Sequence, residues 1–158
     1  MTRLHVPITL RWSDLDAYGH VNNAEMLRLL EEARIRVFWA VEHDDPDAPA
    51  TALLAGGVGA DTMTLIAGQQ IEYLAPVPYL RRPIDVQVWL GRIGGASVEI
   101  CYEVWSPAGT PDPVLYARAS TTLVLVDAAT QRPRRLADRE REAWSVYLGE
   151  PVAFRSRG

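Results

Sequence analysis

A cluster of polar residues precedes the most helix-like segment of the chain. Its members are Asp14, Asp16, Gly19, His20, Asn22 and Asn23. A helix begins with backbone N–H groups that have no partner inside the helix, and its dipole makes that end positive, so a helix start can stabilise an oxyanion. A carboxylate a few residues earlier could act on the same substrate carbon. The spacing is therefore compatible with chemistry at a carbonyl group.

The same residues also fit a purely structural role. Asp14 and Asp16 are common turn formers, Gly19 can adopt a positive φ, and Asn22 is a favourable helix N-cap. The residues alone leave both interpretations open.

Other catalytic signatures are mostly missing. The chain has no G-x-S-x-G elbow, no H-E-x-x-H and no cysteine pair for zinc. The glycine-rich residues 56–59 do not have the spacing that binds a dinucleotide, and we interpret them as a flexible loop. His43 and the aspartates of residues 44–47 resemble a metal site superficially. An acidic loop past a helix end is more often solvated, so we predict no metal.

The composition excludes several function classes. A chain of 158 residues fits one domain, which we expect to span residues 1–158 with a core at about 4–127. The net charge is −4, so no global positive field would hold nucleic acid or an anionic bilayer. All 16 basic residues are arginine, which excludes lysine Schiff-base chemistry and the P-loop lysine.

Cysteine use and hydropathy indicate the compartment. Cys101 is the single cysteine, so no intramolecular disulfide can form and a reducing compartment is expected. The N-terminus lacks the apolar stretch of a signal peptide, and no apolar run is long enough for a membrane span. We therefore expect a cytoplasmic protein.

The elements around the polar cluster follow from the apolar spacing. Alternating residues from Leu4 to Trp12 predict a half-buried strand, and Pro7 favours an edge position or a bulge. Helical spacing runs from about Ala24 to Val41. Asn22 followed by Glu25 has the spacing of a capping box, which predicts that this helix begins near Asn22.

The rest of the chain predicts mainly strands. They are expected at residues 68–74, 84–93, 97–105 and 115–126, and a short helix at about 137–148. The connections are short and rich in glycine and proline, which favours antiparallel neighbours. One strand, a long helix and four strands indicate the α+β class, with one antiparallel sheet wrapped on one buried helix.

The segment WSDLDAYGHVNNAEMLRLLEEAR resembles the opening motif of a known family. That family is the hotdog-fold acyl-CoA thioesterases of the 4-hydroxybenzoyl-CoA thioesterase type. Small bacterial long-chain acyl-CoA thioesterases are included in that family. Its later strands are similar to IEYLAPVPYLRRPIDVQVWLGRIGGASVEICYEV and LYARASTTLVLVDAATQRPRRL. The likeness covers residues 5–138, and D-x-x-G-H-V-N-N is its most specific part. It implies a hotdog fold.

The resemblance implies roles for individual residues. The family's catalytic carboxylate falls on Asp16, with Asp14 ranked second, and the backbone N–H that polarises the thioester carbonyl falls on Asn23. His20 and Asn22 would shape the pocket or position water. Further substrate-binding candidates are Gly19, Arg92 and Ser97.

The resemblance also implies a reaction and its partners. The reaction is hydrolysis of an acyl-CoA thioester, with Asp16 as general base or as nucleophile, and it needs no metal or organic cofactor. A homodimer or homotetramer is expected. Because the chain has no lysine, arginines would bind the CoA phosphates, although solvated surface charge is the favoured interpretation for each arginine taken individually. The candidates are Arg81, Arg82, Arg92, Arg132, Arg134 and Arg135.

Several alternatives stay open. Some subgroups carry the carboxylate on the long helix, where Glu31 or Glu32 would be equivalent, but these residues fit surface pairs with arginines better. The chain could instead be a non-catalytic acyl-CoA or acyl-carrier binding protein, or a structural oligomerisation domain. The acyl preference stays undetermined, because the pattern does not show which aromatic residues face the substrate. Those considered are Trp39, Tyr73, Tyr79 and Trp105.

Overall fold

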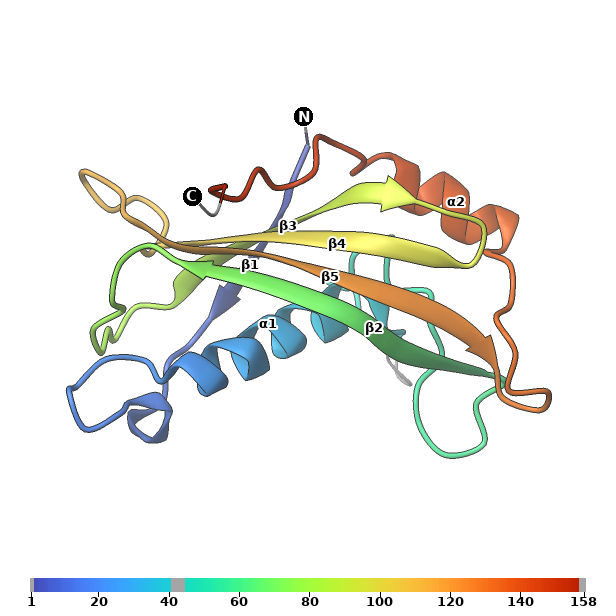
Figure 1. Cartoon of the computed structure of the whole chain (residues 1–158), viewed down its shortest axis with the longest axis horizontal. Helices are drawn as coiled ribbons and strands as arrows, with labels where there is room; N and C mark the ends of the chain where they lie inside the picture. Colours follow the sequence, from blue (N-terminus) through green and yellow to red (C-terminus); the bar gives the residue numbers. More distant parts are fainter. Residues whose placement is uncertain (1, 41–44, 157–158) are drawn as a thin grey trace.

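The computed structural model describes residues 2–40 and 45–156, which form an α+β structure (Figure 1). Its elements are β1 (Leu4–Ile8), a 3₁₀ turn η1 (Trp12–Asp14), α1 (Asn23–Phe38), β2 (Thr62–Tyr73), β3 (Ile84–Ile93), β4 (Ser97–Trp105), β5 (Leu115–Asp127) and α2 (Asp138–Ser145). The predicted order of strand, long helix and four strands is confirmed. Neither helix in the described ranges is long and apolar enough to cross a membrane.

The five strands form one antiparallel sheet in the order β1-β3-β4-β5-β2, so β1 and β2 are its edges. The predicted bounds of β3 and β4 are correct. The prediction for β2 is too short, because the strand begins at Thr62 rather than Gly68 and pairs with β5 along its whole length. A register shift between Ile66 and Gly68 interrupts that pairing. It also interrupts the local alternation pattern.

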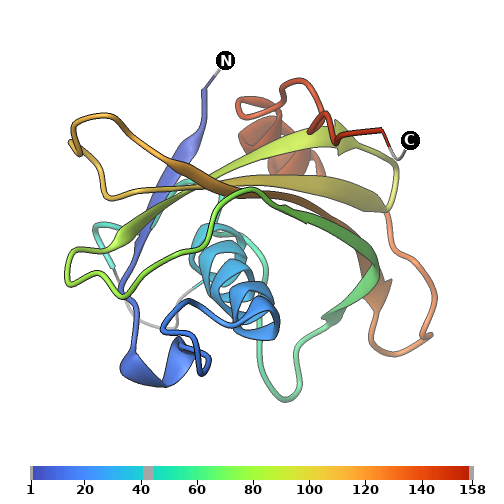
Figure 2. The same ribbon diagram turned by 60° about the vertical axis from the view of Figure 1, so that its left-hand side comes forward.

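One face of the sheet curves over α1 (Figure 2). α1 packs against β1 and β3. The alternation predicted for the strands is confirmed on this face, where the inward side chains are almost fully buried. They include Ile84, Val86, Val88, Val98, Ile100, Val104, Leu123 and Leu125. The helix contributes the apolar stripe read from its spacing: Met26, Leu29, Leu30, Ala33, Val37 and Phe38.

The predicted end of the first strand is wrong. β1 ends at Ile8 instead of continuing to Trp12, because the Arg11 N–H donates to Asp14 Oδ2 at 2.6 Å and the chain turns. Trp12 is consequently 75% exposed. Pro7 does lie on an edge strand, as expected. α1 ends at Phe38, and the predicted end at Val41 lies outside the described residues.

α2 is shorter than predicted and is anchored by a buried carboxylate. Glu140 accepts hydrogen bonds from the Arg134 guanidinium at 2.8 and 2.9 Å and from the Ala137 N–H at 2.7 Å. Burial alone would raise the pKa of Glu140, but these donors outweigh burial and hold that pKa below its usual value. The bidentate pair therefore fixes the start of a helix too short to be stable by itself.

The segment after α2 crosses the sheet on the face opposite α1. The Gly149 N–H donates to the Leu90 carbonyl at 2.8 Å, and the Trp89 indole donates to the Glu150 carbonyl at 2.8 Å. Further on, Arg118 donates to the Ala153 carbonyl at 2.9 Å. This C-terminal segment therefore runs from β3 towards β5, over the side chains between them.

Cys101 on β4 is one of the covered side chains, and its position predicts how reactive its thiol is. It is fully buried, and burial raises the pKa of its thiol to about 11. At pH 8 the thiol is therefore protonated as well as inaccessible, and we expect no reaction with a disulfide reagent in the native protein. Reactivity should rise as the pH approaches 11. Denaturant should release one thiol per chain, measured by absorbance, whereas rapid stoichiometric labelling of native protein would contradict the packing.

Candidate active site

A tight hairpin from Leu15 to Val21 carries three residues of the polar cluster, Asp16, Gly19 and His20. The two ends form an antiparallel bridge, and the Asp16 N–H donates to the His20 carbonyl at 2.8 Å. The Gly19 N–H donates to the Asp16 carbonyl at 3.1 Å, and Gly19 has φ +79°. Aspartate at the first position of a turn and glycine in the left-handed region are the residues that such a turn favours.

The Asp16 carboxylate is half-buried and held by this hairpin. Its Oδ1 accepts the Tyr18 N–H at 2.8 Å and the His20 N–H at 3.3 Å. Its Oδ2 has no hydrogen-bond donor among the described residues. The turn-forming and chemical interpretations of Asp16 are therefore compatible, since one oxygen orients the carboxylate and the other is left for a ligand.

Asp14 is placed differently and is unsuitable for chemistry. Its side chain is fully buried, with Oδ1 2.9 Å from the Arg11 guanidinium and Oδ2 bound to the Arg11 N–H. The Asp14 carbonyl also accepts the Asn22 N–H at 2.8 Å. Both carboxylate oxygens have donors, so Asp14 stabilises the turn before the helix.

α1 begins at Asn23, one residue from the predicted cap. The Asn22 side chain accepts the N–H groups of Ala24 at 2.8 Å and Glu25 at 3.4 Å, so Asn22 is the N-cap. The reciprocal half of the predicted capping box is wrong, because the Asn22 N–H binds Asp14 instead of the Glu25 side chain. Within residues 2–40 and 45–156, the Asn23 N–H has no acceptor.

One pocket of about 520 Å³ brings Asp16, His20 and Asn23 together. The opposite wall of the pocket is formed by residues that follow β2. A hydrogen bond from the Val21 N–H to the Val77 carbonyl, 2.9 Å long, holds the two walls together. The remaining lining residues are Val21, Met26, Tyr73, Leu74, Ala75, Pro76, Val77 and Tyr116. The half-buried carboxylate residue and the first residue of α1 thus line the same pocket, an arrangement that suits attack on a carbonyl group.

Tyr73 links the end of β2 to the first residue of α1. Its hydroxyl donates to the Asn23 carbonyl at 2.7 Å. Burial raises the pKa of the phenol, so Tyr73 keeps its proton at neutral pH and remains a donor. The sequence left Tyr73 among four aromatic candidates and did not indicate Tyr116 at all, because both reach the pocket through strands far along the chain.

The other aromatic candidates lie elsewhere. Tyr79 packs edge to face on Trp12 at the surface, with ring centroids 5.4 Å apart. Trp39 lies at the opposite end of α1, and the Trp105 indole donates to Glu103 at 2.9 Å. None of these three lines the Asp16 pocket.

The helix glutamates are surface residues, as the spacing indicates. Glu31 lies 3.5 Å from Arg34 and Glu32 lies 3.5 Å from Arg36, and both carboxylates are more than half exposed. Neither lines the Asp16 pocket. The alternative with a carboxylate on the helix therefore has no geometric support in this chain.

Arg92 and Ser97 are not brought to the pocket within one chain. Ile84 at the start of β3 pairs with Ile8, near the hairpin, whereas Arg92 lies eight residues further along the strand. That corresponds to about 26 Å at 3.3 Å per residue. Figure 1 shows the β3–β4 turn and the start of α1 at opposite ends of the molecule. Sequence spacing could not indicate this separation, because it depends on strand direction.

The remaining candidate arginines divide by their contacts. Arg134 is committed to Glu140, and Arg82 donates to the Ala108 carbonyl. Arg132 and Arg135 are exposed near Arg134, whereas Arg81 is exposed in the connection after the pocket wall. Arg81 and Arg82 are both exposed in this connection, and of the two only Arg82 has a hydrogen-bond acceptor among the described residues.

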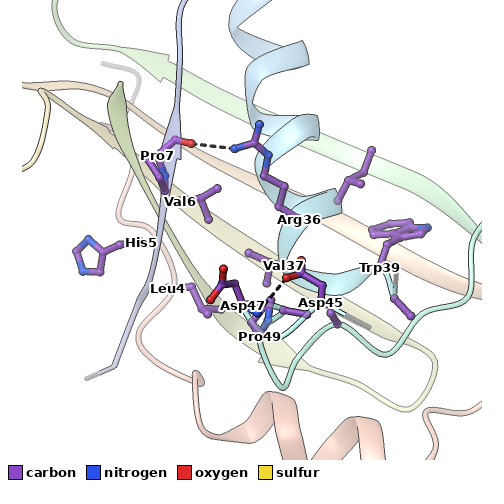
Figure 3. A pocket seen from close by; sticks show the side chains of 14 residues that line it. Leu4, His5, Val6, Pro7, Arg36, Val37, Trp39, Asp45, Asp47 and Pro49 are labelled. Atoms are coloured by element: carbon purple, nitrogen blue, oxygen red, sulfur yellow. Dashed lines mark hydrogen bonds between the residues drawn. The ribbon is translucent and has the colours of Figure 1, made fainter. Parts of the chain in front are cut away.

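A second pocket, of about 450 Å³, lies between β1, the end of α1 and residues 45–52 (Figure 3). Its lining is mainly apolar and also includes Asp45 and Asp47 (Figure 3). His5 points away and pairs with Asp85 at 2.9 Å. His43 and Asp44 of the acidic loop lie outside the described residues. No cluster of three potential metal ligands is found among those described.

Comparison with known proteins identifies similar chains. The family model described as "Thioesterase-like superfamily" matches residues 10–146. The uncharacterized protein YsmA of Bacillus subtilis is 29% identical over 96 residues, which cover 60% of this chain. The match spans 56% of that protein's own length.

Solved structures show the same architecture. A thioesterase from Thermus thermophilus, complexed with coenzyme A and Zn, is 26% identical with a TM-score of 0.66, and the match covers 93% of this chain and 95% of that one. YbaW of Escherichia coli, described as a probable thioesterase, is also 26% identical with a TM-score of 0.66. That match covers 92% of this chain and 98% of YbaW.

Proposed function

Because this chain belongs to the thioesterase-like superfamily, we propose that it hydrolyses an acyl-CoA thioester to the free acid and CoA. The observation that carries the proposal is a single pocket lined by both Asp16 and Asn23, the first residue of α1. Together they supply the two functions that hydrolysis requires, a group that acts on the nucleophile and a donor for the oxyanion. The structural neighbours described as thioesterases, one of them complexed with coenzyme A, support the assignment.

In the proposed reaction, the thioester carbonyl oxygen accepts a hydrogen bond from the Asn23 N–H. The positive end of α1 stabilises the negative charge that develops on that oxygen. Asp16 Oδ2 takes a proton from water, and the water oxygen attacks the carbonyl carbon. The C–S bond then breaks, and the CoA thiolate leaves with the bonding electron pair and is protonated.

A second route uses the same carboxylate as the nucleophile. Asp16 Oδ2 would attack the carbonyl carbon and expel the thiolate, forming a mixed anhydride that water hydrolyses. Either route requires the carboxylate to be oriented towards the carbon, and the two N–H groups that bind Oδ1 would provide that orientation. Neither route calls for a metal or an organic cofactor.

The neighbouring residues are proposed to position these groups. Gly19 provides the left-handed turn that lets the His20 N–H reach Asp16, and Asn22 caps α1 so that the first amides stay in place. The His20 side chain would line the pocket and position water. Arg92 and Ser97 would require a second chain to reach a substrate.

We also propose a cytoplasmic homodimer or homotetramer in which each chain is one domain. The single-domain proposal is supported because α2 and the C-terminal segment both pack on the same sheet. β2 is a 12-residue edge strand with exposed Met63, Leu65 and Ile66, which favours association along that edge. The single buried cysteine suits a reducing compartment.

The test is release of free thiol from a panel of thioesters, from acetyl-CoA to palmitoyl-CoA and aryl-CoA. A colorimetric disulfide reagent suits the assay because Cys101 is buried. Turnover of at least one member is expected. Thermal stabilisation by acyl-CoA with no thiol release across the panel would instead favour the non-catalytic binding protein.

A further inference from the structure

The exposed aromatic side chains are concentrated around the Asp16 pocket. They are Trp12, Tyr18, Tyr73 and Tyr79, and no other aromatic residue in the described ranges is exposed to this degree. All four lie on the two segments that flank the pocket, residues 12–18 and 73–79. Exposed aromatic surface gathered at one place is typical of a binding site.

Trp12 and Tyr79 form one unit within this group. Their rings lie 5.4 Å apart at 75°, although they are far apart in sequence. Trp12 is 75% exposed, whereas the other four tryptophans are buried or half-buried. Contact with Tyr79 leaves most of the indole surface in water, so the pair has apolar surface available for a further flat group.

The pair is held beside the pocket by the backbone. Pro78, the residue before Tyr79, forms a bridge with His20, which lines the pocket. Trp12 is the first residue of the turn that leads into the Asp16 hairpin, and its carbonyl accepts the Leu15 N–H at 3.2 Å. A ligand leaving the pocket on this side would meet the two rings.

Arg81 adds a positive charge two residues after Tyr79. It is exposed, and no salt bridge to it occurs in the part of the chain that the structure describes. Its neighbour Arg82 differs, because it donates to the Ala108 carbonyl. A flat aromatic surface with a nearby guanidinium is complementary to a heteroaromatic base that carries phosphates.

We propose that Trp12 and Tyr79 form a stacking platform for the nucleotide base of CoA and that Arg81 binds one of its phosphates. The inference rests on the proposed acyl-CoA thioesterase function and identifies the part of the substrate that is recognised outside the acyl pocket. The exposed surface of two rings matches the size of a single base. A protein carrier would cover a larger surface. The platform would contribute to binding of CoA and take no part in bond breaking.

The test compares two substrates with the same acyl group, an acyl-CoA and its acyl-N-acetylcysteamine thioester, which lacks the nucleotide. Trp12→Ala and Tyr79→Ala should each raise KM for acyl-CoA about 5- to 100-fold with kcat nearly unchanged. KM for the short thioester should stay at the wild-type value. Arg81→Gln should raise KM for acyl-CoA in the same selective way, and Val146→Ala, which alters a 62% exposed side chain on the C-terminal side of α2, should change nothing.

Three results would overturn the platform. One is an unchanged acyl-CoA KM in the Trp12 and Tyr79 variants, and another is an equal loss with the short thioester. The third is a selective loss with acyl carrier protein as the donor. Calorimetric titration with free CoA separates this inference from the reaction, because weaker CoA binding by Trp12→Ala would support the platform even if no thioester were hydrolysed.

Discussion

Asp16→Asn is expected to lower kcat for thioester hydrolysis by about 10²- to 10⁴-fold. Asparagine has almost the same shape, and its Oδ1 can still accept the Tyr18 and His20 N–H groups, so the hairpin should persist. The amide cannot take a proton from water and is a poor nucleophile. Steady-state thiol release measures kcat, and thermal melting should show stability within about 0.5 kcal/mol of the wild type.

Asp45→Asn provides a matched control. Asp45 also lies in a turn, where its Oδ1 accepts the Asp47 N–H at 2.9 Å, but it follows α1 rather than preceding it. The 16 residues of α1 separate the two turns by about 24 Å. The control should therefore keep wild-type turnover. If Asp16→Asn also kept it, Asp16 would not be the catalytic carboxylate, even if the protein were a thioesterase.

Trp144→Ala is expected to destabilise the protein by about 3–5 kcal/mol. Trp144 is fully buried, packs edge to face on Phe38 of α1 with centroids 5.5 Å apart, and donates from its indole to the Thr51 carbonyl at 2.9 Å. Alanine would leave a cavity where α1, α2 and the loop before β2 meet. For a chain of this size the melting temperature should fall by about 6–20 °C.

Trp144→Phe separates packing from hydrogen bonding. Phenylalanine keeps an aromatic ring beside Phe38 but cannot donate to Thr51, so the loss should be smaller than for alanine. Chemical denaturation with tryptophan fluorescence or circular dichroism measures both variants. A loss below about 1 kcal/mol for Trp144→Ala would show that α2 does not stabilise the core.

The features that were predictable from the sequence depend on short segments. The Asp16 hairpin and the Asn22 cap use hydrogen bonds between residues at most four positions apart, and their residue types are the ones those turns require. The bounds of β3 and β4 follow from strict alternation over a buried face. In each case one stretch of sequence contains both partners of the interaction.

The failed predictions concern contacts that an alternating pattern does not encode. Trp12 continues an alternating pattern, but the buried Asp14–Arg11 contact ends the strand and leaves the indole in solvent. The alternation of apolar and polar residues does not reveal such a competing contact. Asp14 and Asp16 have similar local spacing, and the family resemblance ranks Asp16 first. The three-dimensional structure adds the physical difference, because Asp14 is buried against Arg11 whereas Asp16 lines the pocket.

The amino-acid sequence by itself determined the α+β class, the start of the long helix and the small set of residues that could act on a carbonyl group. Only the tertiary structure decided that Tyr73 joins the start of α1, that Arg92 and Ser97 lie far from it, and which aromatic rings face solvent. The physical reason is the distance along the sequence between the residues that interact. Local hydrogen bonds and apolar periodicity are encoded over a few residues, whereas pocket walls form between strands whose pairing depends on the whole sheet.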